Sequence, residues 1–573
     1  MGGDVDDSLH DVIRFDAQRH PPAGSPPINP LEELHYALET MQTHFFELWL
    51  GTWPNSIDWT GAVLGTYVDA ALYTLTNSLE YILPTLEGAE LPVEGQRVEN
   101  EINKYFSQVI SYYFGENDFA IRTQAHDDML WVVLGWLQSV RFIDLHTAKH
   151  YPASRRGASG EWYGVQFMSA FAHRAHVFYD LAAKGWDTKL CGGGMTWNPH
   201  LRPYKNAITN ELFISASIEM YLYFPGDRNP SPFVAGSDAG SSADAGAAGI
   251  PVAKPHDPKY LRAAIDGYAW LKDSNMTNER GLYVDGFHIH GWSHNGSIGT
   301  GKCDERNEMV YTYNQGVLLS GLRGLWESTD DRSYLEDGHT LVRNVINATG
   351  WKPKPDSSGS AGSNNGTGRW AGLGRGGILE EMCDAAGTCT QNGQTFKGIF
   401  FHHLTLFCAP LPRRPLVPGR TYAATPVEAS LHAQSCKEYA PWVAFNARAA
   451  MKTRNERGEF GMWWGWPAGK GHLDGDRRGF EAPPLPDGAV DYRNNASALL
   501  DWKWSGFRHG RVPSTPEWRR RTWAASSQAH AEAESGNRDA NDRGRGRTVE
   551  TQGGGVSVLR AMWELVKMYG GEK

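Results

Sequence analysis

The sequence predicts an all-α fold in which inner and outer helices alternate around one axis, an α/α toroid. Two observations support this prediction. Apolar residues recur at helical spacing along most of the 573-residue chain, and strand-like alternation with tight hairpin turns is hard to find. The length and the 40% of hydrophobic residues allow a large core, while the 21% of charged residues is typical of a globular protein.

Helical periodicity begins directly after Pro30 and recurs up to the C-terminal region. The first apolar stripe steps by three and four residues through Leu31, Leu34, Leu38, Met41, Phe45 and Leu48. Similar amphipathic or wholly apolar segments follow at residues 60–83, 98–113, 127–147, 165–183, 205–223, 259–272, 310–327, 332–347, 396–408, 427–451 and 553–569. We expect these segments to be the helices of the toroid.

Three stretches interrupt the helical pattern. Residues 229–255 and 353–368 are rich in Gly, Ser, Ala and Asp, and residues 513–549 mix Ala, Glu, Arg and Gly. Such compositions bury too little apolar surface to offset chain entropy, so we expect disordered-like insertions in loops. With a flexible N-terminus at 1–28, the sequence predicts a single domain over residues 1–573.

Charge and hydropathy exclude two classes of partner. The net charge of -10 argues against nucleic acid, whose phosphates require clustered Lys and Arg. No apolar run approaches the roughly 20 residues that a membrane-spanning helix needs. The 22 Trp are compatible with a sugar-binding cleft, because an indole face covers the apolar face of a pyranose, although most Trp residues belong to cores.

Several features favour an oxidising compartment. The six cysteines are an even number, and the short loop between Cys383 and Cys389 resembles a local disulfide staple more than a zinc site. Sequons for N-glycosylation start at Asn275, Asn295, Asn347, Asn365 and Asn495. The N-terminus begins no signal peptide, so we expect it to be mature, trimmed or engineered. We therefore expect a protein that is secreted or associated with the cell wall.

Two adjacent carboxylates, Asp127 and Asp128, open a strongly apolar predicted helix. Acidic residues at this position commonly cap free N–H groups and complement the helix dipole. Alternatively, they are the acid and the nucleophile of a glycosidase. Mutual repulsion would then raise one pKa and keep that group protonated, while the other remains anionic. From the helix pattern alone, both interpretations stay open.

Further motifs accompany the aspartate pair. In chain order they are His126-Asp127-Asp128-Met129-Leu130-Trp131, the segment 191–199 with Gly-Gly-Gly and Trp197, Lys205-Asn206-Ala207-Ile208-Thr209-Asn210, Thr312-Tyr313-Asn314-Gln315-Gly316, 377–381, 396–400 and Thr551-Gln552-Gly553. Together they resemble glycoside hydrolase family 76, the endo-α-1,6-mannanases. The matches extend from about Trp59 to the C-terminus.

The resemblance implies an (α/α)6 barrel and a retaining double displacement on α-1,6-mannosidic bonds. It implies that Asp127 is the nucleophile and Asp128 the general acid/base. No cofactor is expected, and no metal, because the His288/His290 and His402/His403 pairs are accompanied by no His-Glu-x-x-His motif or Cys pair. The implied partner is α-1,6-linked mannan, a manno-oligosaccharide or the glycan core of a GPI anchor, bound by a monomer. Transfer of GPI-linked glycoproteins to wall glucan is the alternative activity, and a catalytically silent mannan-binding protein is a third possibility.

Candidate sugar-binding residues divide by chemistry. They are Trp197, Lys205, Asn206, Asp285, Tyr313, Asn314, Gln315 and Trp464. The amides could bind mannose hydroxyls or cap loops and helix ends. Asp285 matches an acidic position of the family near its cleft, or stabilises the turn before Gly286. We expect core packing for at least one of the three aromatic residues, and Lys205 could instead be a structural residue that forms a salt bridge.

Overall fold

The computed structural model describes residues 28–80, 93–117, 121–122, 124–152, 161–227, 253–293, 295–352, 369–465, 482–494 and 539–569. Helices dominate these residues, and the strands are only two or three residues long. No helix in these ranges is both long and apolar enough to cross a membrane. The predicted all-α class is confirmed.

A closed ring of inner helices forms the core. The inner helices are α3 (Asp58–Ser78), α6 (His126–His150), α8 (Ala207–Tyr223), α10 (Val317–Thr329), α12 (Gln391–Phe407) and α16 (Val549–Tyr569). Each packs against the next, and α16 closes the ring on α3. Helix α8 is buried from Ala207 to Leu222 on every face, as expected for a helix surrounded by others.

An outer layer of amphipathic helices covers the ring. Its members are α2 (Pro30–His44), α4 (Val93–Gly115), α7 (Met168–Ala182), α9 (Pro258–Asp273), α11 (Ser333–Ala348) and α13 (Pro426–Met451). Each alternates along the chain with an inner helix and packs against an inner neighbour. The described residues therefore form six helix pairs around one axis, and the predicted (α/α)6 barrel is confirmed.

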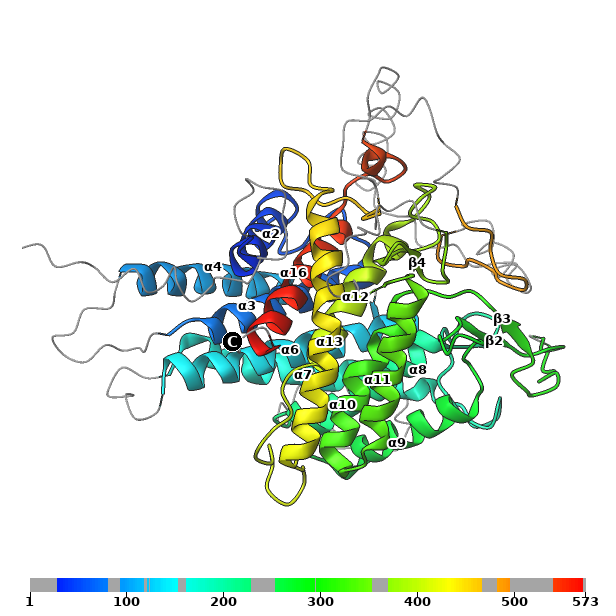
Figure 1. Ribbon diagram of the computed structural model, residues 1–573. Coiled ribbons are helices and arrows are strands. Elements are labelled where there is room, and N and C mark those ends of the chain that lie inside the picture. Colours follow the sequence, from blue (N-terminus) through cyan, green and yellow to red (C-terminus); the bar gives the residue numbers. More distant parts are fainter. Residues whose placement is uncertain are drawn as a thin grey trace, which may run out of the picture.

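The inner helices all run in the same direction. At one end, Gln124 beside the start of α6 donates to Asp58 at the start of α3, and Trp59 donates to Asn392 in the first turn of α12. At the other end, Thr74 in α3 donates to Glu564 in α16. We call these the N-terminal end and the far end of the barrel. Figure 1 places β2 and β3 on the right-hand side and the C-terminus of the chain on the left.

Short strands lie at the N-terminal end, where the sequence predicts none. Strands β1 (Tyr204–Asn206), β2 (Gly286–His288) and β3 (Glu305–Asn307) form an antiparallel sheet in the order β1-β2-β3. The remaining two, β4 (Gly374–Arg375) and β5 (Ile378–Leu379), form a hairpin. Periodicity cannot reveal strands this short. Gly286 has φ 156°, and a Cβ there would lie 2.6 Å from the Cα of Asn206, so the β1–β2 contact requires glycine.

All six cysteines form disulfides. The predicted staple Cys383–Cys389 is present, together with Cys191–Cys303 and Cys408–Cys436. The Cys191–Cys303 bond joins the loop before β1 to the residues before β3. The Cys408–Cys436 bond joins the end of α12 to α13. These bonds agree with the expected oxidising compartment.

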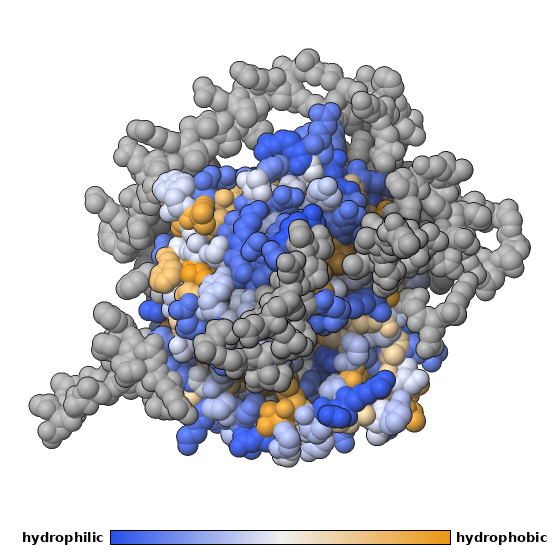
Figure 2. All heavy atoms as spheres, turned by 90° about the vertical axis from the view of Figure 1, so that its left-hand side faces the viewer, coloured by the Kyte–Doolittle hydropathy of each residue, from blue (hydrophilic) through white to orange (hydrophobic). Residues whose placement is uncertain are grey.

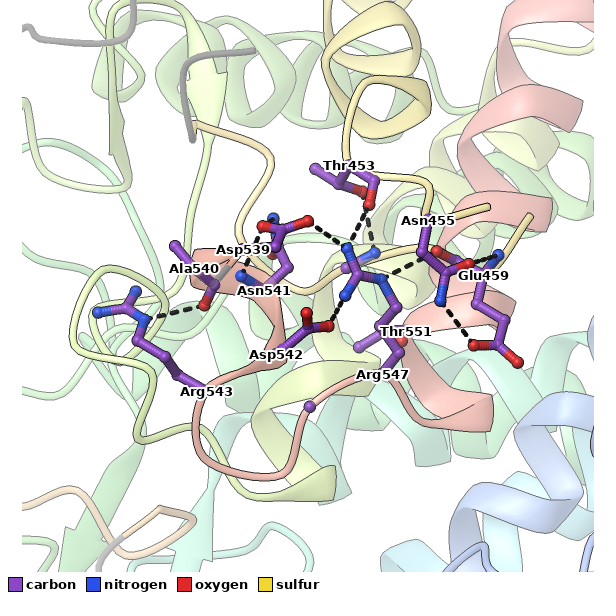
Figure 3. A network of polar contacts seen from close by, with 12 residues as sticks. Thr453, Asn455, Glu459, Asp539, Ala540, Asn541, Asp542, Arg543, Arg547 and Thr551 are labelled. Atoms are coloured by element: carbon purple, nitrogen blue, oxygen red, sulfur yellow. Dashed lines mark hydrogen bonds and ion pairs between the residues drawn. The ribbon is translucent and has the colours of Figure 1, made fainter. Parts of the chain in front are cut away.

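Part of one predicted insertion is well packed. Residues 353–368, most of 229–255 and the start of 513–549 lie outside the described residues. Residues 539–549, in contrast, form the short helix η7 (Ala540–Asp542) and lead into α16. Arg547 anchors this segment by pairing with Asp539 and Asp542 and donating to the carbonyls of Thr453 and Glu459 (Figure 3). The polar composition of this segment therefore reflects ion pairs rather than disorder.

We predict that Arg547→Ala lowers the free energy of unfolding by about 3 kcal/mol, because the buried carbonyls of Thr453 and Glu459 lose a charged donor. Urea unfolding followed by circular dichroism measures the change. Arg457→Ala is the matched control, since the Arg457 side chain is 67% exposed. Equal effects of the two substitutions would contradict the anchoring role.

Candidate active site

The aspartate pair occupies the first turn of α6. Helix α6 starts at His126 after Ala125, whose side chain cannot cap the free N–H groups. Asp128 partly replaces a cap, because its Oδ2 accepts from the backbone N–H of Ala125 at 3.3 Å. Asp127 Oδ1 accepts from the N–H of Asp128 at 3.0 Å. The capping role is therefore real, but it uses only one oxygen of each carboxylate.

The second oxygen of Asp127 is held by two donors from elsewhere in the chain. Trp197 donates its indole N–H to Oδ2 at 2.9 Å, and Arg493 donates to the same oxygen at 3.2 Å. The Arg493 guanidinium also lies over the Trp197 ring, 5.0 Å from its centroid. Asp127 is only 3% exposed, so these contacts fix its position and favour its anionic form.

Arg493 was missed by sequence reasoning. It belongs to the described segment 482–494, which has no regular secondary structure. The same segment presents Asp491, which accepts from the hydroxyl of Tyr311 at 2.7 Å, and Tyr492, whose ring packs against Tyr204. The only signal in the sequence is the cluster Asp491-Tyr492-Arg493-Asn494 in an otherwise Gly- and Pro-rich region.

The two carboxyl groups experience different electrostatic environments. Burial raises the pKa of Asp127, while the charge and hydrogen bond of Arg493 and the Trp197 N–H oppose this rise. Burial raises the pKa of Asp128 well above its usual range, and the neighbouring Asp127 charge raises it further. Asp128 is therefore the group that holds a proton, and Asp127 is the group paired with a cation.

A polar cluster lies under the sheet next to the aspartates. Asp285 accepts from the hydroxyl of Tyr204 at 2.7 Å and from the amide of Asn307 at 3.3 Å. Asn314 faces the same carboxyl group, whose pKa burial raises to about 6. Asn206, Asp285 and Asn314 are at most 1% exposed, so a sugar would reach them only if covering side chains move.

Glu211 in α8 adds a second buried acid to this cluster. It is 0% exposed, and neither carboxylate oxygen has a hydrogen-bond partner among the described residues. Burial raises its pKa well above the usual range, and the nearby Asp285 raises it further. Both amide atoms of Asn206 also lack a partner in the described part of the chain. The cluster thus retains free hydrogen-bonding capacity.

Other predicted sugar-binding residues have structural contacts. Lys205 is buried and donates to the carbonyls of Gly194 and Asp187, which supports the structural alternative. Gln315 exchanges hydrogen bonds with the backbone of Tyr283. Trp464 is 3% exposed and packs near Phe401.

Two aromatic candidates remain at the site. Tyr313 is stacked on Phe396, with ring centroids 3.8 Å apart, and its hydroxyl has no partner among the described residues. Trp197 uses its N–H to hold Asp127 and one ring face to hold Arg493. The main contact of Trp197 at the site is thus the hydrogen bond that positions Asp127.

A protein-family model matches part of this chain. The family described as glycosyl hydrolase family 76 aligns with residues 247–477. The similarity to this family thus covers less than half of the 573-residue chain. The resemblance seen in the sequence motifs is thus confirmed. The aspartate pair lies upstream of this matched range, and Arg493 lies downstream of it.

One curated relative extends the comparison. The mannan endo-1,6-alpha-mannosidase DFG5 of Saccharomyces cerevisiae is 23% identical over 234 residues, which cover 40% of this chain. The aligned part spans only 37% of that relative.

Solved structures of family 76 align at low identity. An inactive variant of the α-1,6-mannanase GH76A of Salegentibacter sp. HEL1_6, in complex with α-1,6-mannotetrose, is 14% identical, with a TM-score of 0.49. The alignment covers 94% of this chain and 100% of the mannanase chain. Dfg5 from Chaetomium thermophilum, in complex with glucosamine, is 15% identical with a TM-score of 0.46, over 76% of this chain and 82% of that chain.

Proposed function

We propose that this protein is a retaining glycoside hydrolase that cleaves α-1,6-mannosidic bonds. One observation carries the proposal: two adjacent carboxyl groups lie in environments that separate their protonation states. Asp127 is paired with Arg493, whereas burial and the Asp127 charge keep the pKa of Asp128 high. A retaining glycosidase needs such a pair, one group as nucleophile and the other as acid and then base.

The proposed reaction has two steps. In the first, Asp127 attacks the anomeric carbon while Asp128 gives its proton to the leaving glycosidic oxygen. The Asp127 carboxylate then forms a covalent ester to the sugar. In the second step, Asp128 takes a proton from water, which attacks the anomeric carbon and releases Asp127. Arg493 and the Trp197 N–H hold the second oxygen of Asp127 throughout.

The substrate assignment is supported by the family and by its named members. The curated relative is named for α-1,6-mannan cleavage, and the Salegentibacter mannanase was solved with α-1,6-mannotetrose. We propose an α-1,6-linked mannan or manno-oligosaccharide as substrate, and that a monomer carries out the reaction.

We further propose that the protein works outside the cell or in the cell wall. Its disulfides fit an oxidising compartment. The sequon residues Asn275, Asn295 and Asn347 are exposed, which glycosylation requires. Mass spectrometry of the protein secreted from a eukaryotic host, before and after glycosidase treatment, identifies the occupied sites.

Incubation with debranched α-1,6-mannan tests the activity. We expect release of manno-oligosaccharides, detected by chromatography and mass spectrometry. A parallel reaction contains short α-1,6-mannosides and a β-glucan acceptor. Acceptor-linked products without free sugar would assign the protein as a transglycosylase instead. Binding of mannan without any product would favour the silent mannan-binding alternative and reject both reactions.

A further inference from the structure

A cavity lies at the far end of the barrel, away from the aspartate pair. Its volume is about 520 Å³, within the usual range for small-molecule sites. The C-terminal halves of the inner helices line it, with Tyr73, Arg141, Glu219, Tyr223, Glu327 and Arg560 among the lining residues. Arg141 follows Asp127 by fourteen positions in α6, which corresponds to about 21 Å along the helix axis.

Polar groups in this cavity have unused hydrogen-bonding capacity. Arg141 lies 4.3 Å from the Tyr223 ring centroid and 5.9 Å from that of Tyr73, so aromatic rings support its guanidinium. No described residue accepts a hydrogen bond from it. Glu219 is 6% exposed, Glu327 is 5% exposed, and neither carboxylate has a hydrogen bond within the described ranges. Their only described partners are the arginine charges.

The other two arginines at the cavity are already committed, and Arg323 donates to the carbonyls of Phe407, Ala409 and Pro410. Arg560 donates to Thr74 and contacts His402. Arg141 is therefore the donor that remains available to a ligand. The exposed Asp144 and Leu416 also line the cavity, so it opens to solvent. Figure 2 views the left-hand side of Figure 1, and polar and apolar side chains are mixed over this end.

The mixture of charges selects a class of ligand. A small anion would meet Arg141 but also Glu219, Glu327 and Glu564, and a cation would meet the arginines. Burial raises the pKa of Glu219 to about 7, so near neutral pH this group can both donate and accept. A neutral ligand with adjacent hydroxyls uses such groups together, because each hydroxyl donates and accepts.

We propose that this far-end cavity is a second saccharide-binding site that takes a neutral hexose unit. The site is separate from the aspartate pair and needs no bond cleavage. Arg141 donates to two adjacent hydroxyls, and Glu219 and Glu327 accept from neighbouring ones. If the protein acts on polymeric mannan, as proposed above, such a site would hold a chain end away from the aspartate pair.

Methyl NMR of the full chain tests the proposal. Met568 lines the cavity, and Met129 follows Asp128 directly, so [13C-methyl]methionine reports separately on the two ends. The probes are methyl α-D-mannopyranoside, glucose, galactose and inorganic phosphate, added to the Asp127→Asn protein. We expect saturable shifts of the Met568 signal with at least one sugar. The Arg141→Lys variant should need a sugar concentration about 10-fold higher, because an ammonium cannot donate two parallel bonds.

The controls make the outcomes distinct. Glu336→Gln, an exposed change on α11, should leave both methionine signals as in the parent. A Met568 response without a Met129 response would support the second site while contradicting the proposed active site. No Met568 response to any sugar, or saturation by phosphate alone, would overturn the proposal. Circular dichroism verifies that each variant is folded.

Discussion

The Asp127→Asn variant is expected to lose at least about 10^3-fold in kcat on α-1,6-mannan. An amide keeps the shape of the side chain, and its single oxygen can still accept from either Trp197 or the Asp128 N–H, so we expect the fold to be preserved. What is lost is the negative charge that the proposed mechanism requires of the nucleophile. Steady-state hydrolysis with wild type and variant at equal concentration measures the effect.

Azide with an activated aryl mannoside separates the roles of the two residues. In Asp128→Ala, azide should intercept the sugar–Asp127 ester and give a mannosyl azide with retained configuration. In Asp127→Ala, azide can only replace the nucleophile and gives the inverted product. These expectations follow from attack on opposite faces of the anomeric carbon. If the two variants exchange products, the roles of Asp127 and Asp128 are reversed.

The helical part of the fold was predictable because it depends on local periodicity. Each inner or outer helix buries a stripe or a full surface, and such patterns persist over many residues. Helix ends were harder: α4 begins at Val93 and ends at Gly115, whereas the pattern indicated 98–113. The three-residue strands of the sheet leave no periodic signal. Their position depends on pairing between residues far apart, such as Asn206 with Gly286.

The site was only partly predictable for a different reason. The aspartate pair has local context and motif support, but polarity alone does not tell whether a residue faces a cleft or a buried carbonyl. Lys205 illustrates this limit, since its ammonium supports the glycine-rich loop at Gly194. Arg493 lies 366 residues from Asp127 in sequence, in a segment without helical pattern. Only the three-dimensional contact identifies it as part of the site.

Replacing Arg493 is expected to change the pH dependence of the reaction. The Arg493 charge and hydrogen bond lower the pKa of Asp127 against the effect of burial. The nucleophile must be ionised, so activity is present above the pKa of Asp127 and lost below it. In Arg493→Met this pKa rises, and the acidic limb of the kcat/KM profile should move to higher pH. Profiles of wild type and variant measure the shift.

The size of the loss in kcat/KM distinguishes direct pairing of Arg493 with Asp127 from an effect of net charge. The Arg493 side chain is 14% exposed, and loss of a buried charge partner costs about 2 kcal/mol or more, which corresponds to roughly 30-fold in kcat/KM. Arg493→Lys keeps a charge near Asp127 and should retain the acidic limb near its original pH. Arg262→Met, an exposed change on α9, controls for net charge. If Arg493→Met is folded and its acidic limb stays in place, another group sets the ionisation of Asp127, and Arg493 only fills space beside Trp197.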